Sequence, residues 1–223
     1  MSQNSADASQ VERLTFFSDA VFAIAITLLV IELKLPALRT PDAHGFLIAL
    51  VQMTADFIGF IVSFFVIGAY WAAHHRAFRW VRRCDDKLIW RNLRFLLLIA
   101  FLPFPTAVMS EYSSVPSASI FYCIVLAGAT INQMLLWRYA LRNPAIVALD
   151  APAAEIRTYF RRSWFLLGAT VICGLLCLVV PVMPVSTFWI LPVAIRIATL
   201  DVVRRLAEKV NPQKTTQVSS PGA

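Results

Sequence analysis

The sequence is poor in charged residues and in glycine, and it lacks the common enzyme motifs. Of its 223 residues, 15% are charged, 7 are glycine and 3 are histidine. It contains no HExxH zinc motif, no nucleophile elbow and no glycine-rich phosphate loop, which are the signatures of metalloproteases, α/β-hydrolases and P-loop enzymes. Its four cysteines have no zinc-site spacing. We therefore predict that the chain is not an enzyme and has no resident metal or cofactor.

Hydrophobic residues make up 59% of the chain, and the mean hydropathy is +0.69. A soluble domain cannot bury that much apolar surface, so we predict an all-α membrane protein. We expect one six-helix transmembrane domain over residues 9–210, with disordered ends at residues 1–8 and 211–223. Six segments reach the ~20 residues that cross a bilayer: 13–35, 46–71, 89–109, 117–140, 160–181 and 185–207.

Basic residues are unevenly distributed between the connections of these spans. They concentrate after the second and fourth spans and in the C-terminal stretch, whereas the connections after the first, third and fifth spans hold only Lys34 and Arg39. Because positively charged loops stay in the cytoplasm, we predict that both termini are cytoplasmic. This asymmetry also explains the net charge of +7, so we expect a lipid bilayer and no nucleic acid as partner.

The first span carries an aspartate, Asp19, within an apolar run. An ionised carboxylate in hydrocarbon costs roughly 2.5–3.5 kcal/mol, so such a helix packs against protein or faces water. At 100° per residue, Ile24, Leu28 and Ile31 form one stripe with Thr27 about 60° to its side. Asp19 points about 140° away from Ile24, and Phe22 shares its face. The stripe either contacts lipid or a neighbouring helix, or lines a symmetric axis.

Possible partners for Asp19 lie at the cytoplasmic ends of the second and third spans. We expect a buried network that joins Asp19 and Arg13 to a histidine, His74 or His75, and to Asn92. A metal site built from Asp19 and both histidines is the alternative. We do not favour it, because adjacent histidines on a helix point about 100° apart.

Two further features concern the third span and the absence of a known filter. The segment Phe101–Thr106 contains two prolines, which usually kink a membrane helix and can also form a hinge. A TVGYG-type carbonyl filter is absent, so if the protein selects ions it does so by another device.

Several of these residues resemble the signature of the transmembrane protein 175 family of potassium channels. The resemblance covers roughly the first half of the chain and rests on these motifs: Arg13-x-x-x-Phe17-Ser18-Asp19, Trp71-x-x-His74, Asp85, Leu88, Asn92 and Phe101-x-Pro103-Phe104-x-Thr106. It implies a homotetramer in a prokaryotic plasma membrane, with the first helix of each subunit around a potassium pore.

The resemblance also implies roles for individual residues of the first helix. Ile24 would form a hydrophobic constriction, followed outwards by Leu28 and Ile31, and the Thr27 hydroxyl would contact ions. The structural or gating residues would be Arg13, Phe17, Ser18, Asp19 and Phe22. Their network partners would be His74 or His75 and Asn92.

Glu32 follows at the outer end of the first helix. It would form either a ring that attracts cations or an ordinary interfacial contact near Lys34.

Two other functions remain open. A proton-coupled secondary transporter would use Asp19, Asp56 or Asp201 as its protonated carboxylate, although we find no internal repeat of the kind that marks many transporters. A narrow, transiently wetted pore could instead leak protons.

Overall fold

The computed structural model describes residues 3–38, 42–147 and 152–179, and these form seven α-helices with no extended strand. Five stretches are long and apolar enough to cross a membrane: Ala6–Ile31, Thr54–Phe78, Asp86–Glu111, Pro116–Arg142 and Ala153–Val179. The sixth predicted span, 185–207, and the tail 211–223 lie outside the described residues. The helices are α1 (Gln3–Ile31), α2 (Ala43–Gln52), α3 (Thr54–Phe78), α4 (Asp86–Phe101), α5 (Pro103–Glu111), α6 (Pro116–Arg142) and α7 (Ala153–Val179).

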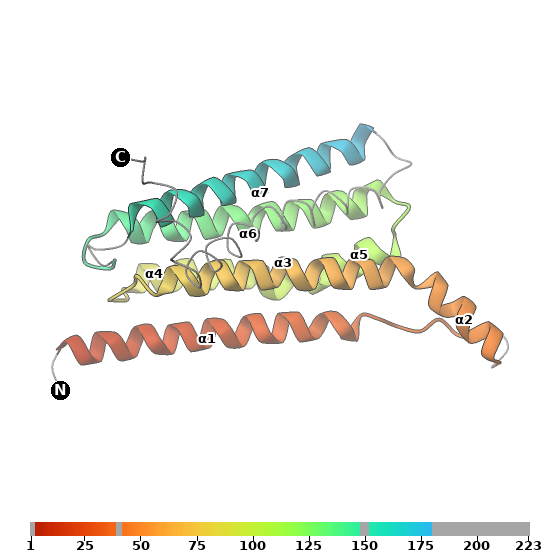
Figure 1. Cartoon of the computed structure of the whole chain (residues 1–223), viewed down its shortest axis with the longest axis horizontal. Helices are drawn as coiled ribbons and strands as arrows, with labels where there is room; N and C mark the ends of the chain where they lie inside the picture. The colour runs from red at the N-terminus through yellow and green to blue at the C-terminus, as the bar shows by residue number, and fades with distance from the viewer. Residues whose placement is uncertain (1–2, 39–41, 148–151, 180–223) are drawn as a thin grey trace, which may run out of the picture.

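The long helices run side by side, and the short helix α2 projects obliquely at one end (Figure 1). α1 packs on α3, α4 and α5, while α6 packs on α4, α5 and α7. The beginning of α1, the α3–α4 connection and the α6–α7 connection lie at the same end of the bundle (Figure 1). The basic connections that we predict to be cytoplasmic are therefore neighbours in space.

Backbone and side-chain contacts join these connections. The Arg82 amide donates to the Ile146 carbonyl at 2.8 Å, beside an isolated bridge between Val81 and Val147. Asp85 begins α4 by accepting from the Leu88 amide at 2.7 Å, and it also accepts from the Tyr139 hydroxyl. An aspartate in this position satisfies an amide that the helix leaves unpaired. Burial raises the pKa of Cys84 in this region to about 11, so its thiol stays protonated.

Several helix boundaries differ from those we predicted. α1 begins at Gln3, so residues 3–8, expected to be disordered, are helical. Their alanines and glutamine favour helix even though they carry no membrane-length apolar run. The second predicted span consists of two helices. α2 starts after its N-cap Asp42 and ends at Gln52, and α3 begins at Thr54, directly after the single residue Met53. A hydropathy pattern detects the apolar stretch and not a one-residue break inside it.

The third predicted span also breaks, between α4 and α5. The two helices meet at Leu102, and Pro103 opens α5. Proline lacks the amide that would continue the hydrogen-bond ladder and its ring clashes with the preceding turn, so a break at this point follows from the sequence. Beyond the break the helical bonding resumes at once, because both the Thr106 amide, at 3.2 Å, and the Thr106 hydroxyl, at 2.9 Å, donate to the Leu102 carbonyl.

The bundle core combines apolar packing with hydrogen bonds between helices. The hydroxyls of Thr106 of α5 and Ser63 of α3 are hydrogen-bonded at 2.8 Å, and Tyr70 of α3 donates to the Leu126 carbonyl of α6 at 3.1 Å. In lipid, such bonds and close packing hold helices together, because burial of apolar surface gives little driving force there. The fully buried apolar side chains around them include Phe22, Ile67, Phe95, Ile99 and Leu126.

Candidate functional site: the first helix and its two polar anchors

α1 has one face inside the bundle and one outside it. Phe22, Ala25 and Leu29 are each at most 2% exposed and pack in the core cluster. On the opposite side Ile24 is 58% exposed, Leu28 39% and Ile31 63%. The described residues therefore leave the Ile24–Leu28–Ile31 stripe uncovered, although the stripe is as apolar as the buried face.

A fully buried hydrogen-bond network fixes α1 to α3 and α4. The Asn92 amide of α4 donates to the Ser18 hydroxyl of α1 at 2.9 Å, and Ser18 donates to the Leu14 carbonyl at 2.8 Å. The Asn92 oxygen accepts from Nε2 of His74 of α3 at 2.8 Å. Because the amide nitrogen is the donor toward Ser18, the amide oxygen faces His74, so the ring donates from Nε2.

Aromatic rings enclose this network. His74 stacks on Phe78 with ring centroids 4.3 Å apart and on Phe95 at 5.7 Å. Phe22 of α1 lies 5.6 Å from the His74 ring and 5.9 Å from that of Phe95. Ser18, His74 and Asn92 are all 0% exposed. With no water available, each lost bond here would leave a buried polar group unpaired, which costs about 1–3 kcal/mol.

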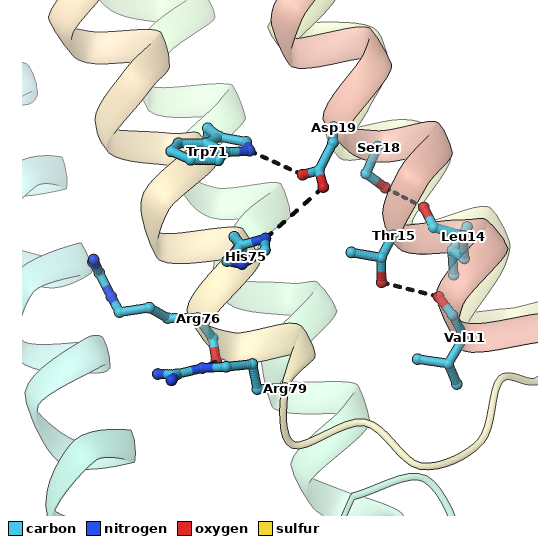
Figure 2. Close-up of polar contacts among 9 residues, drawn as sticks. All are labelled: Val11, Leu14, Thr15, Ser18, Asp19, Trp71, His75, Arg76 and Arg79. Carbon is cyan, nitrogen blue, oxygen red and sulfur yellow. Dashed lines mark hydrogen bonds and ion pairs between the residues drawn. The ribbon is translucent and has the colours of Figure 1, made fainter. Parts of the chain in front are cut away.

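Asp19, the next residue along α1, makes a separate and more open contact with α3. Figure 2 shows Trp71 and His75 turned toward its carboxylate. The indole Nε1 of Trp71 donates to Oδ1 at 2.9 Å, and Nδ1 of His75 lies 3.8 Å from Oδ2. The side chains of His75 and Asp19 are 49% and 30% exposed. The carboxylate is thus satisfied on the α3 side of the helix, away from the exposed stripe.

The two histidines therefore serve different partners. We predicted one network of Arg13, Asp19, a histidine and Asn92, but the structure divides it: His74 joins Asn92 and Ser18, while His75 joins Asp19. Arg13 is exposed and makes no hydrogen bond or ion pair within residues 3–38, 42–147 and 152–179. No metal-binding group of three or more His, Cys, Asp or Glu occurs in the part of the chain that the structure describes.

Our sequence reasoning did not name Trp71 as a ligand of Asp19. Its spacing offers the signal, since Trp71 and His75 are four residues apart and so share one face of a helix. Their rings lie 5.6 Å apart. His75 lies on the same helix face as Trp71, and His74 lies about 100° away from it. The sequence alone does not say which of these two faces meets Asp19, so only the structure distinguishes the two histidines.

The remaining predicted site residues lie on or near the exposed face. Thr27 is exposed, and its hydroxyl donates to the Ile24 carbonyl at 2.9 Å. The hydroxyl proton of Thr27 is used in this bond within the helix, so the lone pairs of the Thr27 oxygen are the part of the side chain that can face outwards. Phe17, at 50% exposed, extends the stripe toward the N-terminal end, and Glu32 is exposed just beyond the last helical residue.

The chain is similar to known ion channels in sequence and in fold. The family model described as the endosomal/lysosomal potassium channel TMEM175 matches residues 13–103. A potassium channel of Chamaesiphon minutus is 36% identical over 154 residues, which cover 67% of this chain and 75% of that one. A potassium channel of Streptomyces collinus is 38% identical over 152 residues, covering 64% and 71%.

A human protein and a solved crystal structure also match this chain. The human endosomal/lysosomal proton channel TMEM175 is 26% identical over 151 residues, 68% of this chain and 30% of the human protein. The crystal structure of a lysosomal potassium-selective channel TMEM175 homolog from Chamaesiphon minutus matches with a TM-score of 0.73 at 30% identity. The match covers 85% of this chain and 97% of the other.

Proposed function

Because this chain belongs to the TMEM175 family of ion channels, we propose that it is a potassium-preferring cation channel of the plasma membrane. The observation that carries the proposal is the exposed stripe of α1. Ile24, Leu28 and Ile31 face away from a bundle that holds the opposite side of the same helix by polar and aromatic contacts. We propose that four copies of the chain assemble so that the four stripes meet around a central pore.

The pore would close and select through hydrophobic rings. Four Ile24 side chains converging on an axis would exclude water, and Leu28 and Ile31 would continue the narrow passage outwards. An ion that passes such a ring sheds part of its hydration shell, and sodium holds its water more tightly than potassium does. Potassium is then favoured. The outward lone pairs of Thr27 would compensate part of this dehydration next to the Ile24 ring.

Asp19 and Ser18 would act on conduction indirectly. Each ties α1 to the helices behind it, so the direction in which Ile24 points depends on where α3 and α4 lie. A shift of α3 that opens the pore would have to carry Trp71 and His74 with it, since both contact α1 or its network. Phe22 belongs to this buried side of the helix. Arg13 and Phe17 are exposed, and we propose that they contact the neighbouring subunit.

Glu32 would stand at the outer entrance. It is exposed immediately after the last residue of α1. Four carboxylates at the mouth would raise the local concentration of cations.

A second candidate, proton conduction through the same pore, is favoured by one finding. The human relative is named as a proton channel. A hydrophobic constriction that wets briefly would pass protons through a short file of water. Proton-coupled transport through Asp19 is a different mechanism, and it would show saturable flux with fixed proton coupling.

The test is the reversal potential of the purified protein in planar bilayers under asymmetric potassium and sodium. We expect unitary currents that reverse toward the potassium equilibrium potential. Reversal at the proton equilibrium potential would support the second candidate. Slow saturable uptake into liposomes without unitary currents would contradict both channel proposals.

A further inference from the structure

Two charged side chains of membrane-length helices remain open to the outside of the described bundle. The side chain of Asp19 of α1 is 30% exposed, and Arg94 of α4 is exposed. Both residues lie within stretches that are long and apolar enough to cross a membrane. A charge on the outside of such a helix is costly in hydrocarbon, so each of these groups requires a polar partner at its own depth.

The contacts of Asp19 leave one oxygen of its carboxylate without a hydrogen bond. Oδ1 accepts from the Trp71 indole at 2.9 Å, whereas Oδ2 has Nδ1 of His75 at 3.8 Å, which is beyond hydrogen-bond distance. Both partners come from α3 (Figure 2). An ionised carboxylate has about four acceptor positions, so this one can take a further donor.

Arg94 supplies donors that the described residues leave unused. It lies on the face of α4 opposite to the buried Asn92, because two residues rotate a helix by about 200°. Within the part of the chain that the structure describes, Arg94 makes no hydrogen bond or ion pair. Trp90 and Leu97, each 68% exposed, share its face. A guanidinium donates through a planar fork that fits a carboxylate, so an open carboxylate oxygen is its natural partner.

Asp19 and Arg94 lie at nearly the same depth. The Asp19 carboxylate is at the level of Trp71, which precedes the last residue of α3 by seven positions. Arg94 follows the first residue of α4 by eight positions. At about 1.5 Å per residue, both levels are about 10–12 Å from the helix ends that the α3–α4 connection joins. The two charges could therefore meet without leaving their own layer of the membrane.

The two charges lie on different flanks of the first helix. α1 packs on both α3 and α4, and Asp19 binds on the α3 side whereas Ser18 binds Asn92 on the α4 side. In a ring of copies with α1 at the centre, each copy turns its α3 flank to one neighbour and its α4 flank to the other. Such a head-to-tail interface brings unlike surfaces together, so Asp19 of one copy faces Arg94 of the next.

We propose that Arg94 of the neighbouring copy completes the Asp19 site by donating to Oδ2, so that one ion pair forms at each interface around the pore. The proposal rests on the tetramer of the proposed function and states which residues join its subunits. Asp19 then connects α1 to α3 of its own chain and to α4 of the next. Asp19→Asn keeps an oxygen for both donors, so it weakens this contact without abolishing it.

The phosphate of an anionic phospholipid is the other anion that Arg94 could bind. We favour Asp19 because Arg94 lies about two turns inside its helix, at the level of an open carboxylate oxygen. Lys87, in the first turn of the same helix, is better placed for a phosphate at the membrane surface. The experiment separates the two occupants.

The test combines charge reversal with co-expression, and it measures by mass photometry the concentration at which the full-length protein in detergent dissociates. We expect Asp19→Arg and Arg94→Asp, each expressed alone, to raise that concentration at least about tenfold, because like charges then meet at every interface. Co-expression of the two differently tagged variants should restore assembly, since alternating rings pair opposite charges at every interface. Arg138→Asp, at an exposed arginine of α6, is the control and should change little.

If Asp19→Arg prevents folding, the neutral variants Asp19→Asn and Arg94→Gln replace the reversals. Each should raise the dissociation concentration roughly two- to fivefold, and the double variant should raise it little further, because either change alone already removes the charge pair. Fully additive effects, or reversals that co-expression does not rescue, would overturn the proposal.

Two further outcomes separate this proposal from its alternatives. Assembly that phosphatidylglycerol strengthens in the unaltered protein and in Asp19→Asn, but not in Arg94→Gln, would assign Arg94 to a lipid headgroup and overturn the ion pair. A tetramer that co-expression rescues but that passes no potassium current would support the ion pair and contradict the proposed conduction. An unaltered protein that forms no tetramer would contradict both.

Discussion

α1 and α7 are both long membrane helices with one buried and one exposed apolar face, yet they are held in different ways. Ile24 of α1 is 58% exposed and Ile172 of α7 is 56% exposed, so neither exposure nor hydropathy decides which of the two helices lines the proposed pore. The buried hydroxyls of α7, Ser163 and Thr170, donate to carbonyls of their own helix. In contrast, Ser18 and Asp19 of α1 bind side chains of α4 and α3.

The bonds from Ser18 and Asp19 to the neighbouring helices fix the rotation of α1 about its axis. Directional bonds on two adjacent residues, Ser18 and Asp19, do not allow α1 to turn by a fraction of a residue without loss of those bonds. The proposed pore, in which the outward side chains of α1 meet those of three other copies, requires such a fixed orientation. We infer that the polar anchors, and not the apolar stripe alone, distinguish α1 as the pore helix.

The largest effect on stability is expected from removal of the buried anchor. Asn92→Ala would leave both His74 Nε2 and the Ser18 hydroxyl without their partner in a dry environment, at a cost of about 2–4 kcal/mol. The matched change Asn132→Ala removes a bond from Asn132 to the Gly128 carbonyl of its own helix and should cost far less. Thermal unfolding of the two purified variants tests this, and equal losses would show that the anchor is dispensable.

A smaller effect is expected at Asp19. Asp19→Asn keeps an oxygen that accepts from Trp71 and loses only the charge facing His75, so stability should fall by about 1 kcal/mol or less. We expect assembly to survive and the open probability to change, measured in single-channel recordings. If selectivity is abolished while assembly and open probability are normal, Asp19 lines the pore and our assignment of the two faces is wrong.

The smallest effect is expected at Thr27. Thr27→Val has nearly the same shape but no oxygen, so the pore should keep its rings and lose the proposed contact with dehydrated ions. We expect a modest fall in potassium conductance with unchanged thermal stability. Thr158→Val, at a threonine of α7 whose hydroxyl likewise donates to a carbonyl of its own helix, is the control. An identical response of both variants would remove Thr27 from the conduction path.

The two faces of α1 could be predicted from the sequence because a helix repeats every 3.6 residues and the stripe and Asp19 obey that period. The break at Leu102 could also be expected, since Pro103 cannot continue a helix. The division of labour between His74 and His75 could not. Both are polar residues at one helix end, and only the packing of α4 decides which of them meets Asn92.

Two other features were not predicted from the sequence pattern. Trp71 was an apolar residue in the pattern, yet its Nε1 is the closest donor to Asp19. The one-residue break at Met53 contains no proline or glycine that would predict it. Helical hydrogen bonds continue on both sides of this residue, since the Met53 amide donates to the Ala49 carbonyl and the Met53 carbonyl accepts from the Phe57 amide.

The most direct test of the central claim compares Ile24→Asn with Ile172→Asn in single-channel recordings. The two isoleucines are almost equally exposed and receive the same polar group, so they differ in the helix that carries them. We predict that Ile24→Asn changes unitary conductance or the potassium-to-sodium permeability ratio several-fold while the assembly persists, and that Ile172→Asn leaves both unchanged. Unaltered permeation in Ile24→Asn would contradict a pore lined by α1.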